Sequence, residues 1–513
     1  MSRLLFFVCL SAFPILCFAA EPPNIVIILA DDMGWGDPQC YNAESKCPTP
    51  NIDRLAAGGM RFTDAHTPSS VCTPTRYTLL TGRYCWRTRL KSSVLDGFSP
   101  PLIEPDRTTI ADFLKNKGYA TACIGKWHLG MQWTRRDGTP ENADRGAERG
   151  FRPGDDIDFS EPITGGPLTA GFDSFYGISA SLDMPPYCWI NNDRADPAPD
   201  TSVETAKDTI FLNQTGGKAH SEFSIFDVLP VLKKRATDWI TGHVEEKPEE
   251  PFFLYLPLNS PHLPVAPSKK FEGITDFGSY CDFVVETDDF VGGVLEALES
   301  TGKLENTLVL FTSDNGGLWH QWDPQEADDL AGYRPTSRAK YNEEFGHRSN
   351  AHLRGTKADI WEGGHRVPFL VQWPGRIEAG TVSDEPVELT DVFATVAGIF
   401  GGKLEDGTAP DSFSLLPVLE GKSLDKPARP YLVHHSLTGV FAIRKDGWKL
   451  IEQRGSGGFS QPKFPTRPPK DGPAGQFYLI DEDVSETLNL WDEEPERVAE
   501  MSALLEKVSV EGR

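Results

Sequence analysis

Four apolar runs of the chain stop abruptly at polar residues. The first covers residues 25–29 and is followed at once by Asp31 and Asp32. The others predict strands near 119–124, 252–257 and 307–312, and each is followed by charged or amide side chains. Continuous apolar runs of this length are typical of buried parallel strands, because both faces of such a strand are covered.

Helical spacing of apolar positions separates these runs. The segments TTIADFLKNKG (108–118) and FVGGVLEALESTGK (290–303) both repeat apolar residues at three- and four-residue intervals. Strands that alternate with helices predict an α/β fold, with a large, mostly parallel central sheet sandwiched by helices. The length of 513 residues predicts two domains.

The pattern changes after about residue 425. Residues 428–454 alternate as antiparallel strands do, with a turn at Asp446 and Gly447. A Gly/Pro-rich stretch (455–475) reads as a surface loop, and a short strand and a helix follow it. We therefore predict a catalytic domain at 21–425 and a smaller domain of antiparallel sheet plus helix at 426–513.

Residues 1–20 have the pattern of a secretory signal peptide. An early arginine precedes an uncharged apolar run that ends in small residues, which predicts cleavage near Ala19 or Ala20. The mature protein is then expected to be secreted or periplasmic. No later segment offers the roughly 20 apolar residues of a membrane span, so none is expected in the mature protein.

Charge and cysteine content narrow the possible partners. The formal net charge of −25 argues against nucleic acid, although a small anionic substrate can bind where cations gather in a cleft. Of nine cysteines, two lie in the leader, and setting Cys72 aside leaves six. Fifteen pairings of these six are possible, and the sequence does not choose among them: Cys40, Cys47, Cys85, Cys123, Cys188 and Cys281.

The polar residues at the strand ends are expected to meet in one crevice. Ligands of parallel sheets bind beyond the carboxyl ends of the strands. Any one of these groups alone is more often a loop, a cap or a solvated face, but unrelated loops have no reason to share this placement. The residues are Asp31 and Asp32, Lys126 and His128, His262, and Asp314 with Asn315.

These side chains suggest a metal beside an anion pocket. Three aspartates and an amide oxygen form a hard ligand set that suits Ca²⁺ or Mg²⁺ and lacks the Cys or multiple His ligands of zinc. Arg76, Lys126, His128, His262 and Lys357 supply the surrounding cations. Such a combination describes a site for a tetrahedral oxyanion.

Cys72 lies in the stretch SSVCTPTRYTLLTGR. We expect a helix with Thr73 as N-cap, Pro74 at its first position and Gly82 just beyond its end. Cys72 would then precede a helix N-terminus, where anionic groups are favoured. A buried, space-filling cysteine and a nucleophile or its precursor both fit this position.

The motifs in residues 24–373 resemble, in order, those of the type I formylglycine-dependent sulfatases, an arylsulfatase-like family of the alkaline phosphatase superfamily. They are the opening ADD, CTPTR with LLTG, GKWHLG, SPH, SDNGG and KADIWEGGHRVP. The resemblance implies that a separate maturation enzyme oxidises Cys72 to formylglycine (3-oxoalanine). It would explain why a cysteine stands at this place.

The resemblance also assigns roles. The metal, Ca²⁺ in preference to Mg²⁺, would be held by Asp31, Asp32, Asp314, Asn315 and residue 72. A hydroxyl of the hydrated aldehyde would attack sulfur and form a covalent sulfated enzyme, and the second hydroxyl would then expel sulfate. His128 would be the base, His262 with Lys357 the acid, while Arg76 and Lys126 orient residue 72.

The substrate is expected to be a sulfated carbohydrate, with a 6-sulfate on galactose or N-acetylgalactosamine as our choice. Candidate sugar-binding residues pair aromatic rings with carboxylates or lie where the second domain begins: Asp183, Tyr187, Trp189, Trp319, Trp322, His434 and His435. Two alternatives stay open. One is a phosphate or phosphonate ester hydrolase of the same superfamily, and the other a non-catalytic protein that binds sulfated glycans if Cys72 is unmodified.

Overall fold

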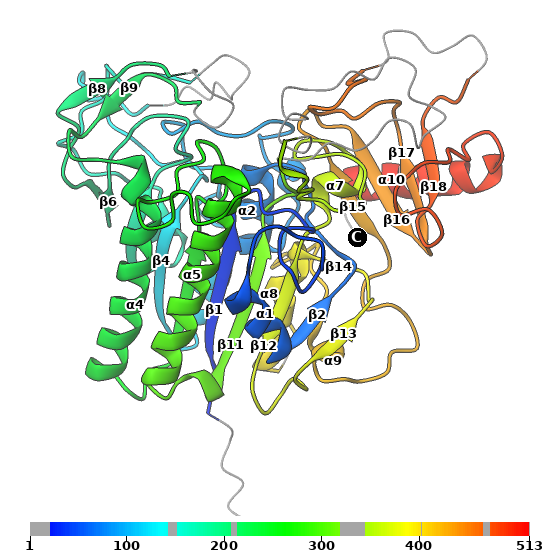
Figure 1. The fold of residues 1–513 in the computed structure, drawn as a ribbon, viewed down its shortest axis with the longest axis horizontal. Coiled ribbons are helices and arrows are strands. Elements are labelled where there is room, and N and C mark those ends of the chain that lie inside the picture. Colours follow the sequence, from blue (N-terminus) through cyan, green and yellow to red (C-terminus); the bar gives the residue numbers. More distant parts are fainter. Residues whose placement is uncertain are drawn as a thin grey trace, which may run out of the picture.

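A ten-stranded sheet forms the centre of the computed structural model, which describes residues 21–141, 151–206, 213–318, 344–401, 403–464 and 472–511 (Figure 1). Strands β11, β1, β10, β4 and β5 are parallel, whereas β12 runs antiparallel to β11. In sheet order the strands are β13 (Thr381–Ser383), β2 (Met60–Phe62), β12 (Phe369–Gln372), β11 (Thr307–Ser313), β1 (Asn24–Ala30), β10 (Phe252–Pro257), β4 (Ala120–Lys126), β5 (Ser174–Ile178), β6 (Ile190–Asn191) and β7 (Arg194–Ala195).

Helices cover both faces of this sheet, as the apolar runs predict. In β1, Ile25, Ile27 and Leu29 face one core, and Val26 and Ile28 face the other. The first core contains α2 (Cys72–Thr81), α3 (Ile110–Lys115), α8 (Val392–Ile399) and α9 (Leu416–Leu419). The second contains α1 (Pro50–Ala57), α4 (Val228–Glu246) and α5 (Gly278–Ser300), and Figure 1 shows α4 and α5 side by side. The α/β prediction is confirmed.

A smaller antiparallel sheet follows in the C-terminal region. Its strands, in order, are β15 (Leu432–His435), β16 (Phe441–Lys445), β17 (Trp448–Ile451) and β18 (Gln476–Leu479). Asp446 and Gly447 have positive φ angles of 51° and 78° and form the predicted turn. Helix α10 (Pro495–Glu511) packs on this sheet through Val498, Met501 and Leu505. The boundary near residue 425 stays a prediction.

The remaining elements are short. They are β3 (Ala65–His66) paired with β14 (Val387–Glu388), β8 (Thr201–Val203) paired with β9 (Gly217–Ala219), helix α7 (Glu362–His365), and the 3-10 turns at Cys85–Arg87, Pro167–Ala170, Ile225–Asp227, Leu304–Asn306 and Leu389–Asp391. Within the described residues no helix is both long and apolar enough to cross a membrane.

One disulfide joins two of the six cysteines whose pairing the sequence left open. Cys47 and Cys281 form a disulfide, and the other described cysteines carry free thiols. The bond joins the segment that follows β1 to the first turn of α5 across 234 residues of sequence. It therefore fastens the loop beyond the carboxyl end of β1 to the helical layer.

We expect Cys281→Ser to lower the free energy of unfolding by about 2–5 kcal/mol, because the unfolded chain gains the freedom that the cross-link removes. Urea unfolding under non-reducing conditions measures the change. Cys85→Ser, which alters a buried free thiol, is the control. An equal stability of Cys281→Ser and wild type would contradict a structural role of the bond.

Candidate active site

The predicted strand-end residues converge above the carboxyl ends of β1, β11, β10 and β4, at the first turn of α2. Arg76 of α2 donates from Nε to Asp314 Oδ2 (2.9 Å), and its Nη2 lies 3.5 Å from Asp31 Oδ2. Lys126, the last residue of β4, contacts the Asp31 carboxylate. All four side chains are fully buried. The loops therefore meet in one ionic cluster, as the sheet topology predicts.

The cations of the cluster offset the effect of burial on the pKa of Asp31. Burial alone would raise the pKa of its carboxyl group, but Lys126, His262 and Arg76 together hold this pKa well below its usual range. The negative charge of Asp31, in turn, raises the pKa of the neighbouring Asp314. Burial, followed by repulsion from Asp31, raises the pKa of Asp314 to about 7.

Asp32 connects Lys357 and Asn315 to the cluster. Lys357 Nζ lies 2.7 Å from Asp32 Oδ1, and Asn315 Nδ2 donates to the same oxygen over 2.7 Å. Asp32 has a φ angle of 64°, a left-handed conformation that is uncommon outside glycine and asparagine. The carboxylate of Asp32 raises the pKa of Lys357 although burial opposes it, so this lysine stays charged.

These residues fit a hard divalent cation. Three buried carboxylates and one amide lie together, and the amide oxygen of Asn315 is buried without a hydrogen-bond partner in the described structure. Ligand atoms of Asp31, Asp32, Cys72 and His262 lie within 4.8 Å of one another. An orphaned oxygen beside repelling carboxylates is the environment that Ca²⁺ or Mg²⁺ stabilises.

Helix α2 begins earlier than predicted. Cys72 is its first residue and Val71 the N-cap, so the expectation of Thr73 as N-cap is wrong. The Thr73 hydroxyl instead bonds to residues outside the helix. The other end is as expected, because Gly82 ends the helix in the left-handed region with a φ angle of 59°.

Cys72 lies between opposite charges. Its Sγ atom is 3.5 Å from both Asp31 Oδ1 and Lys357 Nζ, and the side chain is buried. Burial, and then the charge of Asp314, raises the pKa of the thiol far above neutrality. The unmodified cysteine is therefore protonated and a poor nucleophile at neutral pH.

His128 follows β4 with a φ angle of 55°. Its Nε2 atom lies 2.9 Å from the Leu95 carbonyl oxygen, and its Nδ1 atom is buried without a partner in the part of the chain that the structure describes. Burial, and then the charges of Lys126 and Arg76, keep its pKa well below the usual value. A neutral ring with a free lone pair suits a general base.

Ser181 is a site residue that the sequence analysis missed. Its hydroxyl lies 3.1 Å from His262 Nδ1 and 3.3 Å from Lys126 Nζ. His262 Nε2 is also 3.7 Å from Asp32 Oδ2, and burial, then Lys357, lowers the pKa of His262. The position of Ser181 shortly after β5, another parallel strand of the sheet, was the available signal.

The predicted sugar-binding loop is only partly exposed. Asp183 is half-buried, and its Oδ1 atom has no partner among the described residues. Tyr187 is buried, and its hydroxyl donates to the Thr215 carbonyl over 2.6 Å. Trp189 stacks on Tyr176 with ring centroids 5.1 Å apart. The two aromatic residues therefore pack the loop, whereas Asp183 is left with a free acceptor. Trp319 and Trp322 lie outside the described residues.

His434 and His435, the candidate sugar-binding residues where the second domain begins, do not face solvent. Both rings are fully buried and point to opposite sides of β15. His434 stacks on His365 at 3.9 Å and bonds to the Thr67 carbonyl, whereas His435 packs against Trp86. Paired histidines on a strand look alike in the sequence whether they face solvent or a core.

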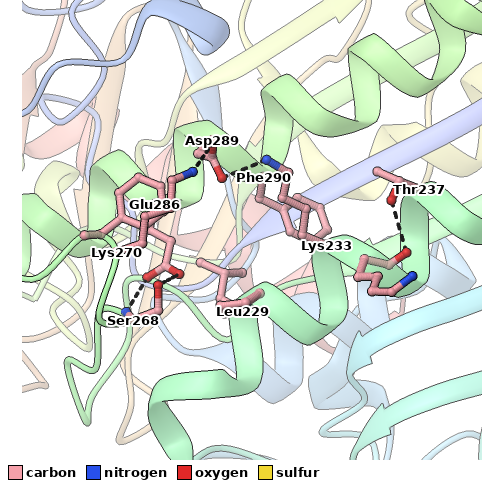
Figure 2. Close-up of a pocket in the computed structure, with 11 residues that line it drawn as sticks. Leu229, Lys233, Thr237, Ser268, Lys270, Glu286, Asp289 and Phe290 are labelled. Carbon is pink, nitrogen blue, oxygen red and sulfur yellow. Dashed lines mark hydrogen bonds and ion pairs between the residues drawn. The ribbon is translucent and has the colours of Figure 1, made fainter.

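A cavity of about 360 Å³ between α4 and α5 is separate from this cluster. Figure 2 shows Lys233 and Lys270 paired with Asp289, and Ser268 hydrogen-bonded to Glu286. None of the predicted catalytic residues lines it. This cavity is therefore not part of the candidate active site.

Carboxylates, cations and a cysteine lie together at the ends of the strands of this α/β sheet. Such a site is typical of a hydrolase that acts on an ester of an oxyanion. The family model for sulfatases matches residues 23–402. The chain therefore belongs to the sulfatase family, and it is a sulfuric ester hydrolase.

Similar proteins support this assignment. The N-acetylgalactosamine-6-O-sulfatase of Bacteroides thetaiotaomicron is 32% identical, covering 95% of this chain and 93% of that protein. Human N-acetylgalactosamine-6-sulfatase is 31% identical, covering 80% and 68%. A solved chain described as "6S-sulf", from work on the metabolism of multiple glycosaminoglycans by Bacteroides thetaiotaomicron, superimposes with a TM-score of 0.78 and 30% identity, covering 96% and 100%.

Proposed function

We propose that the protein removes a 6-O-sulfate from galactose or N-acetylgalactosamine in sulfated carbohydrates, after Cys72 has been converted to formylglycine. The observation that carries the proposal is the position of residue 72. It lies 3.5 Å from both a carboxylate of the candidate metal site and a buried lysine. A nucleophile placed there would meet a bound sulfate between a cation and proton donors.

The metal would be held by Asp31, Asp32, Asp314, Asn315 and residue 72, with Ca²⁺ preferred over Mg²⁺. When bound, it would neutralise sulfate oxygens and favour ionisation of a hydroxyl on residue 72. Arg76 and Lys126 hold Asp314 and Asp31 in place through the ion pairs of the cluster. They keep three carboxylates together that would otherwise repel one another.

The aldehyde hydrate at residue 72 supplies two hydroxyls: one displaces the sugar oxygen from sulfur, and loss of the proton on the other expels sulfate and restores the aldehyde. Lys357, with His262, gives the departing sugar oxygen its proton. His128 accepts the proton from the second hydroxyl at its free Nδ1 atom. Ser181 orients His262 and Lys126 through its hydroxyl.

The choice of substrate draws on the relatives. Two of them, from Bacteroides thetaiotaomicron and human, are named for the 6-sulfate of N-acetylgalactosamine. In this chain, Asp183 offers an unpaired carboxylate oxygen that can accept hydrogen bonds from sugar hydroxyls. We also propose secretion or periplasmic export after cleavage near Ala19 or Ala20, modification by a separate formylglycine-generating enzyme, and domain limits of 21–425 and 426–513.

Sulfate release from matched monosaccharides tests the substrate. We expect turnover of galactose 6-sulfate or N-acetylgalactosamine 6-sulfate at least about tenfold faster, in kcat/KM, than of the 4-sulfated isomer. A preference for the 4-sulfate would overturn the regiochemistry. Faster hydrolysis of a phosphate monoester than of any sulfate would favour the phosphatase alternative, and tight binding without release would favour a glycan-binding role.

Metal removal should stop the reaction. We expect dialysis against a chelator to lower kcat by about 100-fold or more, because the metal neutralises charge on the reacting sulfate. Addition of Ca²⁺ should restore activity, and the comparison with Mg²⁺ identifies the preferred ion. In Asn315→Ala the Ca²⁺ concentration for half-maximal recovery should rise at least about tenfold, because a ligand is lost. The exposed Asn191→Ala is the control, and chelator-resistant activity would contradict the metal assignment.

A further inference from the structure

The hydroxyl of Thr73 bonds to two segments outside its own helix. It donates to the His128 carbonyl over 3.1 Å and accepts from the Leu95 backbone N–H over 3.2 Å. Two other threonines of α2 behave differently, because Thr78 and Thr81 each donate to the carbonyl four residues earlier. Thr73 thus joins the first turn of α2 to the two loops that flank residue 72.

Leu95 completes a closed loop of hydrogen bonds. Its carbonyl lies 2.9 Å from His128 Nε2, and a carbonyl can only accept, so Nε2 carries the proton. In the neutral ring the lone pair is then on Nδ1, which is buried and has no partner among the described residues. The Leu95 carbonyl therefore selects the tautomer in which Nδ1 can accept a proton.

The backbone of His128 needs this support. Its φ angle of 55° lies in the left-handed region, which costs roughly 1–2 kcal/mol for a residue with a Cβ atom. Such a conformation persists only where the surroundings determine it, and the Thr73 hydroxyl bonds directly to the carbonyl of this residue. The groups whose charges act on the ring are Lys126, Arg76 and Asp31. None of them bonds to the imidazole.

We propose that Thr73 is a positioning residue for catalysis: its hydroxyl fixes the backbones of Leu95 and His128, and so keeps His128 Nδ1 available as the proton acceptor. This inference rests on the proposed role of His128 as the base. Because Thr73 adjoins residue 72, one side chain links the first turn of the nucleophile's helix to the backbone of the base.

Thr73→Val tests the proposal, since valine keeps the shape and removes the hydroxyl. At equal formylglycine content, measured by mass spectrometry, we expect kcat to fall by about 10–100-fold while KM changes less than about threefold. The acidic limb of the kcat profile should move to lower pH, because a weaker bond from Nε2 to Leu95 disfavours the protonated ring. Thr73→Ser, which retains the hydroxyl, should recover most of kcat.

Thr78→Val is the matched control, because it removes a buried hydroxyl of the same helix whose bond among the described residues is to the Pro74 carbonyl. A Thr73→Val enzyme with normal kcat and an unmoved acidic limb would overturn the proposal, as would equal losses in Thr73→Val and Thr78→Val. His128→Gln separates the positioning role of Thr73 from the role of His128 as the base. If it is inactive while Thr73→Val is normal, only the positioning role fails; if it is active, the assignment of the base fails.

Discussion

Cys72→Ala is expected to lower sulfate release by about 10⁴-fold or more in kcat. In the proposed mechanism residue 72 supplies the atom that attacks sulfur, and loss of a nucleophile removes most of the rate enhancement. The side chain is buried at the first turn of α2, between Asp31 and Lys357. Among the described residues, Cys72 is the one cysteine in the group that it forms with Asp31, Asp32 and His262.

Initial rates of sulfate release, with circular dichroism to confirm folding, measure this effect. Cys85→Ala is the matched control, because it removes another buried free thiol and is expected to stay within about threefold of wild type. A Cys72→Ala variant that retains more than about a tenth of wild-type kcat would contradict covalent catalysis at this residue.

Lys449→Met is expected to lower the free energy of unfolding by about 3–5 kcal/mol, because it removes a buried cation that pairs with the carboxylates of Glu362 and Glu486. Lys449 of β17 is fully buried, and its Nζ atom lies 3.1 Å from Glu362 Oε1 and 2.8 Å from Glu486 Oε1. Glu362 belongs to α7 and Glu486 follows β18, so this lysine joins the small sheet to the main domain.

The pH dependence of this loss follows from Glu486. Burial raises its pKa from 4.5 to about 7, so folding is favoured where the carboxyl is protonated and disfavoured as the pH rises toward 7. The destabilisation by Lys449→Met should therefore be smaller at about pH 6 than at about pH 8. Urea unfolding at both values measures it.

Lys445→Met is the control, because this lysine of β16 is partly exposed and pairs with Glu500 at the surface. Its expected effect is below about 1 kcal/mol. Similar losses in the two variants would show that the buried lysine has no special role, and a loss in Lys449→Met that grows as the pH falls would contradict the account of Glu486.

The strands and their ends could be predicted because apolar runs and polar clusters are local features of sequence. The run at 25–29 and the pair Asp31 and Asp32 needed only the rule that parallel strands end at one edge. Lys357 was identified from its loop just before a predicted strand, and the family resemblance supplied its role. The cluster around Cys72 is therefore the part of the molecule that could best be predicted from the sequence.

Other features depend on packing between distant segments. The burial of His434 is set by the stacked ring of His365, 69 positions away, and no local pattern distinguishes it from an exposed histidine. Ser181 and Thr73 act through hydrogen bonds to residues on other strands and loops. The disulfide was one of fifteen pairings, and only the approach of the loop after β1 to α5 selects it.

The most direct test is the mass of the tryptic peptide that contains Cys72, taken from protein purified from its own host. The account predicts a mass about 18 units below that of the cysteine form, which is the change from thiol to aldehyde. An unmodified thiol in this natively made protein would contradict the proposed mechanism and favour the alternative of a protein that binds sulfated glycans without hydrolysing them.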